Sequence, residues 1–274
     1  MFRRAEFDNL PAVDMHIHTV YCGHAAPDMT LGNIVRRAEQ VGLKQIAITE
    51  HVWNNQCLAE LEILRKEFEG LESAITVRLG AEVDVDSRYG DGRLIEQIAS
   101  CFRPLIIATH AYPESTIIWY ADEHSSQRTR RRLLKKWFRW VTAAVQQEQV
   151  DVLAHPGVMV SREGPGVRFE AEILDRFTDL FGVMRAHGVA FELNEHVKRK
   201  LLSPQQHETY HNLPALAAEL GVKFSVASDS HELGQIGQFE WVSRVAKRAG
   251  LQASDFRVYN GPGLVKGPSQ YCSQ

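Results

Sequence analysis

Cysteines are few in this chain of 274 residues, and their spacing excludes two common roles. No pair of them is arranged as Cys-x-x-Cys, so neither a disulfide framework nor a thiolate zinc knuckle is indicated. Reduced thiols in a cytoplasmic protein are the simplest interpretation. The four residues are Cys22, Cys57, Cys101 and Cys272.

Long apolar runs and a strong charge of one sign are missing as well. No run of about 18 apolar residues is present to span a bilayer, and the N-terminus lacks the apolar stretch of a signal peptide. We therefore predict a cytoplasmic protein that does not associate with membranes. The formal net charge of -3 argues against a protein that holds nucleic acid mainly by bulk electrostatics. The composition does not indicate an oligomeric state.

Short apolar runs alternate with longer helical patterns along the chain. The runs are rich in Val, Ile, Leu, Phe and Ala with little alternation, which is typical of strands buried on both faces. The predicted strands are 13–19, 45–51, 77–85, 104–110, 150–157, 189–195 and 222–231. The predicted helices are 30–41, 57–70, 91–100, 122–148, 170–187, 208–220 and 239–249.

Seven alternating strand–helix units predict an α/β fold with parallel strands, and a run this long without a break in composition favours a TIM-like barrel. We expect one domain over residues 1–274, with residues 261–274 as an irregular tail. Glycines also stand where helix C-terminal caps belong. These are Gly42, Gly188, Gly221 and Gly250.

Side chains that can bind metals recur at the ends of the predicted strands. His16 and His18 share one face of the first strand, because successive side chains of a strand alternate. In a parallel barrel, the C-terminal strand ends form one rim where active sites lie. The candidate ligands that converge on this rim are His16, His18, His24, His51, Glu82, His110, His155, Asp229 and His231.

Two arguments favour a metal centre over chance clustering. A lone strand-end histidine such as His110 is more often a hydrogen-bonded core residue, but randomly placed histidines would not recur at the same end of successive strands. Glu82 and Asp229 lie in apolar strands, where a carboxylate is costly unless it is paired or coordinated. Histidine and carboxylate ligands suit Zn²⁺, Mn²⁺ or Fe²⁺ better than Mg²⁺ or Ca²⁺. We therefore predict a centre of two to three divalent ions.

The strand-end motifs resemble, in chain order, those of the polymerase and histidinol phosphatase (PHP) family. The matching segments are VDMHIHT with the later His24, AITEH, GAEVDV, ATH, LAHPG and ASDSH. The resemblance spans residues 13–231 and fills every ligand position that the family pattern expects. It implies a distorted (β/α)7 barrel that holds three divalent metals. The amidohydrolase pattern differs, because it usually bridges two metals with a carbamylated lysine and no lysine ends the fourth strand here.

The resemblance also implies how the ligands divide among three metals. The ligands of the first metal would be His16, His18, Glu82 and Asp229. Glu82 would bridge to a second metal, whose further ligands would be His110 and His155. The ligands of the third metal would be His24, His51 and His231.

Phosphate ester hydrolysis is the reaction that such a centre favours. Two metals about 3.5–4 Å apart can hold a bridging hydroxide that attacks phosphorus in line. Glu82 and Asp229 are then the catalytic carboxylates. Since the chain is close to one barrel in length, a stand-alone phosphatase is favoured over a module attached to a polymerase. The expected substrate is a small phosphomonoester such as histidinol phosphate or a nucleotide.

Substrate-binding residues are expected on two loops. His196 follows the sixth strand and is a candidate acid that protonates the leaving oxygen. A Gly-rich loop over 157–169 carries candidate phosphate clamps, because guanidinium groups bind phosphate in bidentate geometry. The candidates for substrate contact are Asn194, Arg162, Arg168, Lys198 and Arg199. For Lys198 and Arg199, the solvated start of a helix is an equal alternative.

Two other functions stay open at this point. The basic segment 127–140, QRTRRRLLKKWFRW, would suit an exonuclease or phosphodiesterase that binds oligonucleotides. A solvated outer helix face whose apolar residues pack on the barrel is the favoured interpretation of this segment. A metal-stabilised regulatory module without turnover is the third hypothesis, and the intact ligand set argues against it.

Overall fold

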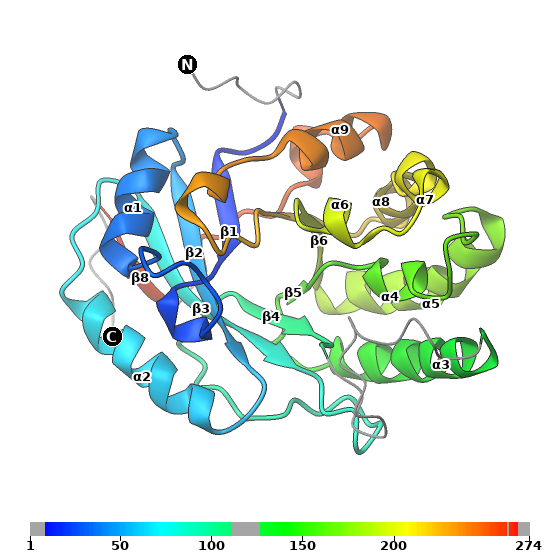
Figure 1. The fold of residues 1–274 in the computed structure, drawn as a ribbon, viewed down its shortest axis with the longest axis horizontal. Helices are drawn as coiled ribbons and strands as arrows, with labels where there is room; N and C mark the ends of the chain where they lie inside the picture. Colours follow the sequence, from blue (N-terminus) through cyan, green and yellow to red (C-terminus); the bar gives the residue numbers. More distant parts are fainter. Residues whose placement is uncertain (1–8, 111–126, 262, 268–274) are drawn as a thin grey trace.

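Seven parallel strands form the centre of the molecule, and helices lie around them (Figure 1). The computed structural model describes residues 9–110, 127–261 and 263–267. The strands pair in the order β1-β2-β3-β4-β5-β6-β7, which confirms the predicted arrangement. They are β1 (Val13–Ile17), β2 (Gln45–Val52), β3 (Thr76–Asp84), β4 (Leu105–Ala108), β5 (Val152–Leu153), β6 (Ala190–Asn194) and β7 (Phe224–Ala227).

The sheet nearly closes into a barrel where the end of β1 meets the segment after β7. The backbone N–H of His18 donates to the carbonyl of Ser230 at 3.1 Å, and that of Asp229 donates to the carbonyl of His16 at 2.9 Å. Ile17 and Ser230 form a parallel bridge between these bonds. The predicted TIM-like barrel is therefore confirmed, and its seam lies beside three of the predicted metal ligands.

The helices follow the predicted order with some changes. The longer ones are α1 (Leu31–Gln40), α2 (Gln56–Glu69), α3 (Gln127–Ala144), α5 (Ala171–His187), α7 (Pro204–Thr209), α8 (Asn212–Glu219) and α9 (Glu240–Arg248). The short ones are α4 (Val158–Ser161), α6 (Val197–Lys200), η1 (Val20–Cys22), η2 (Leu233–Gln235) and η3 (Ala253–Asp255). All four predicted cap glycines have left-handed backbone angles, as a C-terminal cap requires.

The predicted helix over 91–100 is wrong. This segment folds back on the end of β3, so the N–H of Asp86 donates to the carbonyl of Arg93 at 2.8 Å. Val85 and Leu94 form an antiparallel bridge. Gly92 has a φ of 78°, which an L side chain rarely adopts, and a Cβ there would lie 2.3 Å from the backbone of Ala144. Pairing with β3 and this close approach therefore replace the helix.

Two other predicted helices have different bounds. The helix predicted over 208–220 is broken, since α7 ends at Thr209 and α8 starts at Asn212. Pro214 lies in the first turn of α8, where its missing N–H is not needed. The helix predicted over 122–148 is observed as α3 from Gln127, and its residues 122–126 lie outside the described residues.

Part of the expected irregular tail is a strand. Leu264–Lys266 forms β8, which pairs antiparallel with Val77–Leu79 of β3. Sequence pattern alone does not show this strand, because it is only three residues long and its pairing partner is far away in the chain. None of the helices in the described ranges has the length and apolar character needed to cross a membrane.

A buried carboxylate ties together the N-terminal end of the barrel. Asp151, which precedes β5, lies 2.5 Å from a guanidinium nitrogen of Arg103 and 2.8 Å from one of Arg257. It also accepts a hydrogen bond from the N–H of Leu105 at 2.9 Å. This network fixes β4, β5 and the C-terminal segment to one another, away from the ligand-bearing rim.

We expect Asp151→Ala to lower the free energy of unfolding by about 3 kcal/mol, because two guanidiniums and a buried N–H lose their partner. The arginines are 26% exposed, so water replaces part of the loss. Urea unfolding measures this change. Asp179→Ala, at an exposed position of α5, serves as the control and should stay within about 0.5 kcal/mol of the parent. Equal stability of the two variants would contradict the role of this network.

Candidate metal centre

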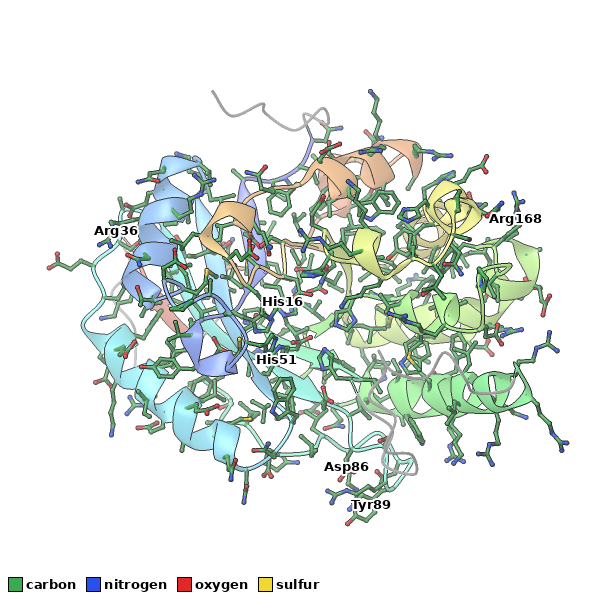
Figure 2. All side chains as sticks on the ribbon, in the orientation of Figure 1. His16, Arg36, His51, Asp86, Tyr89 and Arg168 are labelled. Carbon is green, nitrogen blue, oxygen red and sulfur yellow. The ribbon has the colours of Figure 1, made fainter. Side chains whose placement is uncertain are left out.

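All nine predicted metal ligands lie on the C-terminal rim of the barrel. Figure 2 shows His16 and His51 near the centre of the molecule, inside the ring of helices. His16, His18 and Glu82 are almost fully buried, and His24 is exposed. The parallel strands therefore bring residues from across more than 200 positions of sequence to one place, as the strand-end pattern predicts.

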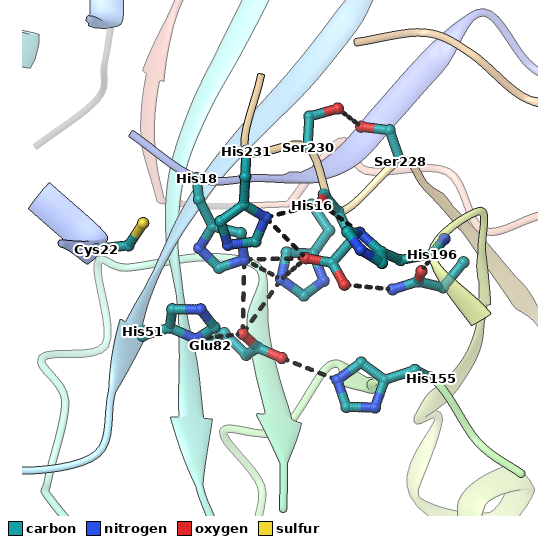
Figure 3. Close-up of polar contacts among 12 residues, drawn as sticks. His16, His18, Cys22, His51, Glu82, His155, His196, Ser228, Ser230 and His231 are labelled. Atoms are coloured by element: carbon teal, nitrogen blue, oxygen red, sulfur yellow. Dashed lines mark hydrogen bonds and ion pairs between the residues drawn. The ribbon is translucent and has the colours of Figure 1, made fainter. Parts of the chain in front are cut away.

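Glu82 occupies the middle of this cluster (Figure 3). Its Oε2 lies 2.7 Å from His51 Nδ1 and 3.3 Å from His16 Nε2. Its Oε1 lies 3.3 Å from His155 Nε2 and 3.6 Å from His110 Nε2. Its Oε2 also lies 3.7 Å from His18 Nε2. The two oxygens of one carboxylate thus face different sets of imidazoles, which is the arrangement of a ligand that bridges two ions.

Asp229 lies on the other side of the β1 histidines. Its Oδ1 is 3.2 Å from His18 Nε2 and 3.8 Å from His16 Nε2, and these two ring nitrogens are 2.9 Å apart. Asp229 has a φ of 55° and His155 a φ of 34°, a region that residues other than glycine rarely adopt. Strain of this kind is held only where the surrounding structure imposes it, and it clusters at functional sites.

The loop that carries Asp229 is anchored from below by a second carboxylate. Asp14 of β1 accepts hydrogen bonds from the N–H of Ser228 at 2.9 Å and from that of Gly237 at 3.1 Å. Asp14 is fully buried, and this burial raises its pKa to about 6. The bonds hold the segment after β7 against β1, which places Asp229 opposite the two histidines.

The predicted third set of ligands stacks together at the outer edge. The ring centroids of His24 and His231 are 4.5 Å apart, and those of His24 and His51 are 5.2 Å apart. His18 stacks on both His51 and His231, at 4.1 and 4.4 Å. Metal-ligand atoms of His18, His51 and His231 lie within 4.8 Å of one another. The outer and inner ligands therefore form one continuous cluster.

Two carboxylates at the edge of the cluster each contact one ring nitrogen of a histidine, so that its second ring nitrogen faces the cluster. Glu192 Oε1 lies 2.7 Å from His16 Nδ1, and Asp84 Oδ1 lies 2.6 Å from His110 Nδ1. When each Nδ1–H donates to its carboxylate, the Nε2 lone pair is left to bind a metal. Sequence reasoning missed both acids, although each shows the signal that identified Glu82, a carboxylate inside an apolar strand.

We expect Glu192→Gln to weaken metal binding by about 10–100-fold, the usual cost of removing a carboxylate behind a histidine ligand. Competition with a chromogenic chelator measures the affinity. Glu219→Gln, at an exposed position of α8, is the control and should leave the affinity unchanged. If Glu192→Gln bound metal as tightly as the parent protein, the contact with His16 would not orient this ligand.

The electrostatics of the cluster favour bound cations. Burial alone would raise the pKa of Glu82, but the nearby His16, His110 and His51 hold it well below its ordinary value. The same balance applies to Asp229, whose pKa is held well below its ordinary value by His16 and His18. Both carboxylates therefore stay ionised, and positive charge close to them is stabilising.

The pKa values of the histidines in the cluster are shifted as well. Burial lowers the pKa of His51 to about 4 and that of His231 to about 3, so both are neutral near pH 7 with a lone pair available. Burial also disfavours the charged form of His110, yet Asp84 and Glu82 raise its pKa to about 9. Several buried atoms make no hydrogen bond, which fits metal ligands: His18 Nδ1, His51 Nδ1, Glu82 Oε2 and His231 Nε2. The residues present thus fit a group of divalent cations.

A cavity of about 710 Å³ opens above the cluster. Of the predicted substrate residues, Asn194, His196, Arg162 and Arg199 line it. Lys198 is exposed and is not among the lining residues. Arg168 lies far from the cavity at the edge of the molecule (Figure 2), exposed and paired with Glu170 at 2.8 Å. Lys200, which sequence reasoning did not select, lines the cavity instead of these two.

His196 is held at the cavity by the backbone of the metal cluster. Its Nδ1 lies 3.2 Å from the carbonyl oxygen of Asp229, and its N–H donates to Asn194 Oδ1 at 2.7 Å. Burial lowers the pKa of His196, so the imidazole is neutral near pH 7. With Nδ1–H donating to the carbonyl, Nε2 is an acceptor. The role of His196 as the acid that protonates the leaving oxygen stays a prediction.

Comparison with known proteins now identifies the family. A model of the PHP domain matches residues 14–196. The chain belongs to the PHP domain family. As a PHP protein it is an enzyme, a phosphoesterase of the PHP type, which confirms the resemblance drawn from the strand-end motifs.

PHP relatives of similar length include several named phosphatases. A probable phosphatase of Thermoanaerobacter sp. (strain X514) is 24% identical over 265 residues, which covers 93% of this chain and 92% of the relative. A probable histidinol-phosphatase of Deinococcus radiodurans is 24% identical over 249 residues, covering 82% and 88%.

Solved PHP structures share the fold. Histidinol phosphate phosphatase from Lactococcus lactis, complexed with zinc, L-histidinol and phosphate, superposes with a TM-score of 0.59 at 20% identity, covering 88% of this chain and 94% of its own. The putative histidinol phosphatase from Listeria monocytogenes gives a TM-score of 0.53 at 15% identity, covering 82% and 97%. These matches establish the barrel architecture.

Proposed function

We propose that this PHP protein is a phosphatase that hydrolyses a small phosphomonoester at a centre of two to three divalent ions. The observation that carries the proposal is Glu82, whose two oxygens face different sets of imidazoles. Three of these imidazoles, those of His51, His110 and His155, line the cavity. His110 and His155 would hold one ion with it, and His16, His18 and Asp229 would hold the other. His24, His51 and His231 would hold a third. Zn²⁺, Mn²⁺ and Fe²⁺ suit these ligands.

The chain's own residues would position the phosphate above this centre. Arg162, Arg199 and Lys200 line the cavity, and guanidinium groups match the oxygens of a phosphate dianion in bidentate geometry. Asn194 Nδ2 lies 3.2 Å from Asp229 Oδ2 and 2.9 Å from Glu192 Oε2, which keeps both carboxylates in place. Bound divalent ions would supply Lewis acidity toward the phosphoryl oxygens and a nucleophile from water.

A cationic or aromatic alcohol is the leaving group that the cavity favours. The side chains of Trp53 and Trp137 form aromatic parts of the cavity wall. Glu232, an exposed residue, adds a carboxylate to the lining. An imidazole can stack on such a wall and an ammonium group can pair with the carboxylate. Histidinol phosphate carries both groups. The relatives named as histidinol phosphatases support this substrate over a nucleotide.

Phosphate release tests the proposal on protein loaded in turn with Zn²⁺, Mn²⁺ and Fe²⁺. The panel contains histidinol phosphate, nucleoside monophosphates, glycerol phosphate, an aryl phosphodiester and a short oligonucleotide. We expect histidinol phosphate to be hydrolysed with the highest kcat/KM. Preference for a diester would contradict the monoester assignment, and bound metal with no turnover on any ester would favour the regulatory module.

The oligonucleotide alternative gains no support from α3. Its apolar residues Leu134, Trp137 and Trp140 are buried against the barrel, as the favoured interpretation of the basic segment expects. Figure 2 shows side chains of α3 projecting away from the body of the molecule. The exposed basic residues on this outer face are Arg128, Arg131, Arg132, Lys135 and Arg139.

A further inference from the structure

Cys22 lies at the outer edge of the metal cluster, in the 3₁₀ turn η1 that follows β1. The residue is 8% exposed. Its Sγ, one ring nitrogen of His24 and one ring nitrogen of His231 all lie within 4.8 Å of one another. Figure 3 includes Cys22 in the close-up of the site. A thiol therefore joins two imidazoles already assigned to the outer ion.

His24 and His231 each have one ring nitrogen, Nε2, that is available to bind a metal next to Cys22. Nδ1 of His24 lies 3.0 Å from the carbonyl oxygen of Cys22, and Nδ1 of His231 lies 3.1 Å from that of Asp229. With each Nδ1–H donating to a carbonyl, Nε2 of each ring keeps its lone pair. His231 Nε2 is buried and makes no hydrogen bond.

A fully buried imidazole adds an independent indication of a ligand. His18 has no exposed surface, and its Nδ1 makes no hydrogen bond. Its ring stacks on that of His231 at 4.4 Å, and ligand atoms of His18, His51 and His231 lie within 4.8 Å of one another. A buried polar atom without a partner is costly unless a ligand satisfies it. The donors around His231 therefore point to a cation.

We propose that Cys22 is a thiolate ligand of the outermost metal ion, together with His24 and His231. This inference rests on the proposed metal centre and goes beyond the nine ligands of the family pattern. On binding, the Sγ–H bond breaks, its proton passes to solvent and an Sγ–metal bond forms, with no change in oxidation state. Because a soft thiolate prefers Zn²⁺ to Mn²⁺, Cys22 makes the outer position zinc-selective, whereas the inner positions have only nitrogen and oxygen ligands.

Cobalt spectroscopy tests this ligand directly. The protein is stripped with a chelator, reloaded with Co²⁺ and examined in the near ultraviolet, where sulfur-to-cobalt charge transfer absorbs and nitrogen or oxygen ligands do not. We expect this absorption in the parent protein and its loss in both Cys22→Ser and Cys22→Ala. Cys57→Ser is the matched control, since Cys57 is buried on α2 with its Sγ 3.6 Å from Asn54 Oδ1, and it should keep the absorption.

The results separate this inference from the proposed function. Bound Co²⁺ and phosphomonoester turnover without the charge-transfer absorption would overturn the role of Cys22 alone. Absorption that persists in a folded Cys22→Ser variant would overturn it as well. Protein that binds no divalent ion would overturn both the metal centre and the thiolate ligand. In zinc and manganese competition, Cys22→Ser should retain less zinc than Cys57→Ser, and equal retention would contradict the predicted selectivity.

Discussion

Glu82→Gln is expected to lower kcat by about 10³-fold, the upper end of the range for removing one group that stabilises the transition state. Glutamine keeps the size of the side chain but loses the charge and one of the two acceptor oxygens. The pairs His16–His18 and His110–His155 would then no longer share one anionic ligand. The loss should appear in phosphate release with every metal, because no other described carboxylate faces both pairs.

The control for this variant is Glu39→Gln on α1, whose carboxylate accepts a hydrogen bond from the N–H of Ala74 at 2.8 Å, away from the rim. Its kcat should match that of the parent protein. Circular dichroism and metal analysis on both variants separate loss of turnover from loss of folding. A Glu82→Gln protein that kept its turnover would refute the bridging role of this residue.

Removing the metal ions is expected to destabilise the protein strongly. Each ion that binds only the folded state contributes about 2.7 kcal/mol when free metal exceeds its Kd by about 100-fold. Two occupied sites then contribute about 5 kcal/mol, which for a chain of this size lowers Tm by roughly 10–20 °C on removal. Without ions, the charges of Glu82 and Asp229 are balanced mainly by histidines. Thermal unfolding with and without a chelator measures the difference.

The stability of the metal-free protein should pass through a maximum near pH 6.5, the ordinary pKa of histidine. Carboxylates raise the pKa of His110 to about 9, so its contribution is complete below pH 6.5 and disappears as the pH rises through 9. His51 and His231 have pKa values lowered to about 4 and 3, so stability also falls as the pH drops from 6.5 toward 4. Added zinc should therefore stabilise the protein more at pH 8.5 than at pH 6.5.

Tm measured from pH 5 to 9 on chelated protein, with and without zinc, tests this profile. His187→Gln is a suitable control, because this histidine ends α5 at an exposed position away from the cluster. The control should shift Tm by the same amount at every pH. A metal-free protein whose stability rose steadily toward pH 9 would contradict the assigned histidine pKa values.

Local pattern was enough to predict the barrel and the rim on which the candidate ligands lie. Each strand is a short apolar run between helices, and a strand in a parallel barrel ends on one rim whatever its neighbours are. His16 and His18 had to share a face because the strand period is two. His51, Glu82 and His110 follow from the same rule, since each lies at or near the C-terminal end of its strand. For this reason all nine predicted ligands meet in the structure.

Contacts between segments that are far apart in the chain could not be predicted from local sequence pattern. Glu192 reaches His16 across 176 positions, and no local period relates the two residues. The segment 91–100 has a composition compatible with a helix, but pairing with the end of β3 decides its conformation. Strand β8 likewise forms only because it pairs with Val77–Leu79 of β3.

The sequence by itself determined the order of strands, the nine candidate ligands and, through their motifs, the family. Only the tertiary structure decided which basic residues face the cavity. Successive residues of α6 point about 100° apart, so Arg199 and Lys200 line the cavity and Lys198 does not. The tertiary structure also brought Cys22 to His231, because β1 and β7 meet at the barrel seam. The regular spacing of residues predicts which side chains of one helix or strand share a face. Only tertiary packing decides which side chains of different elements meet.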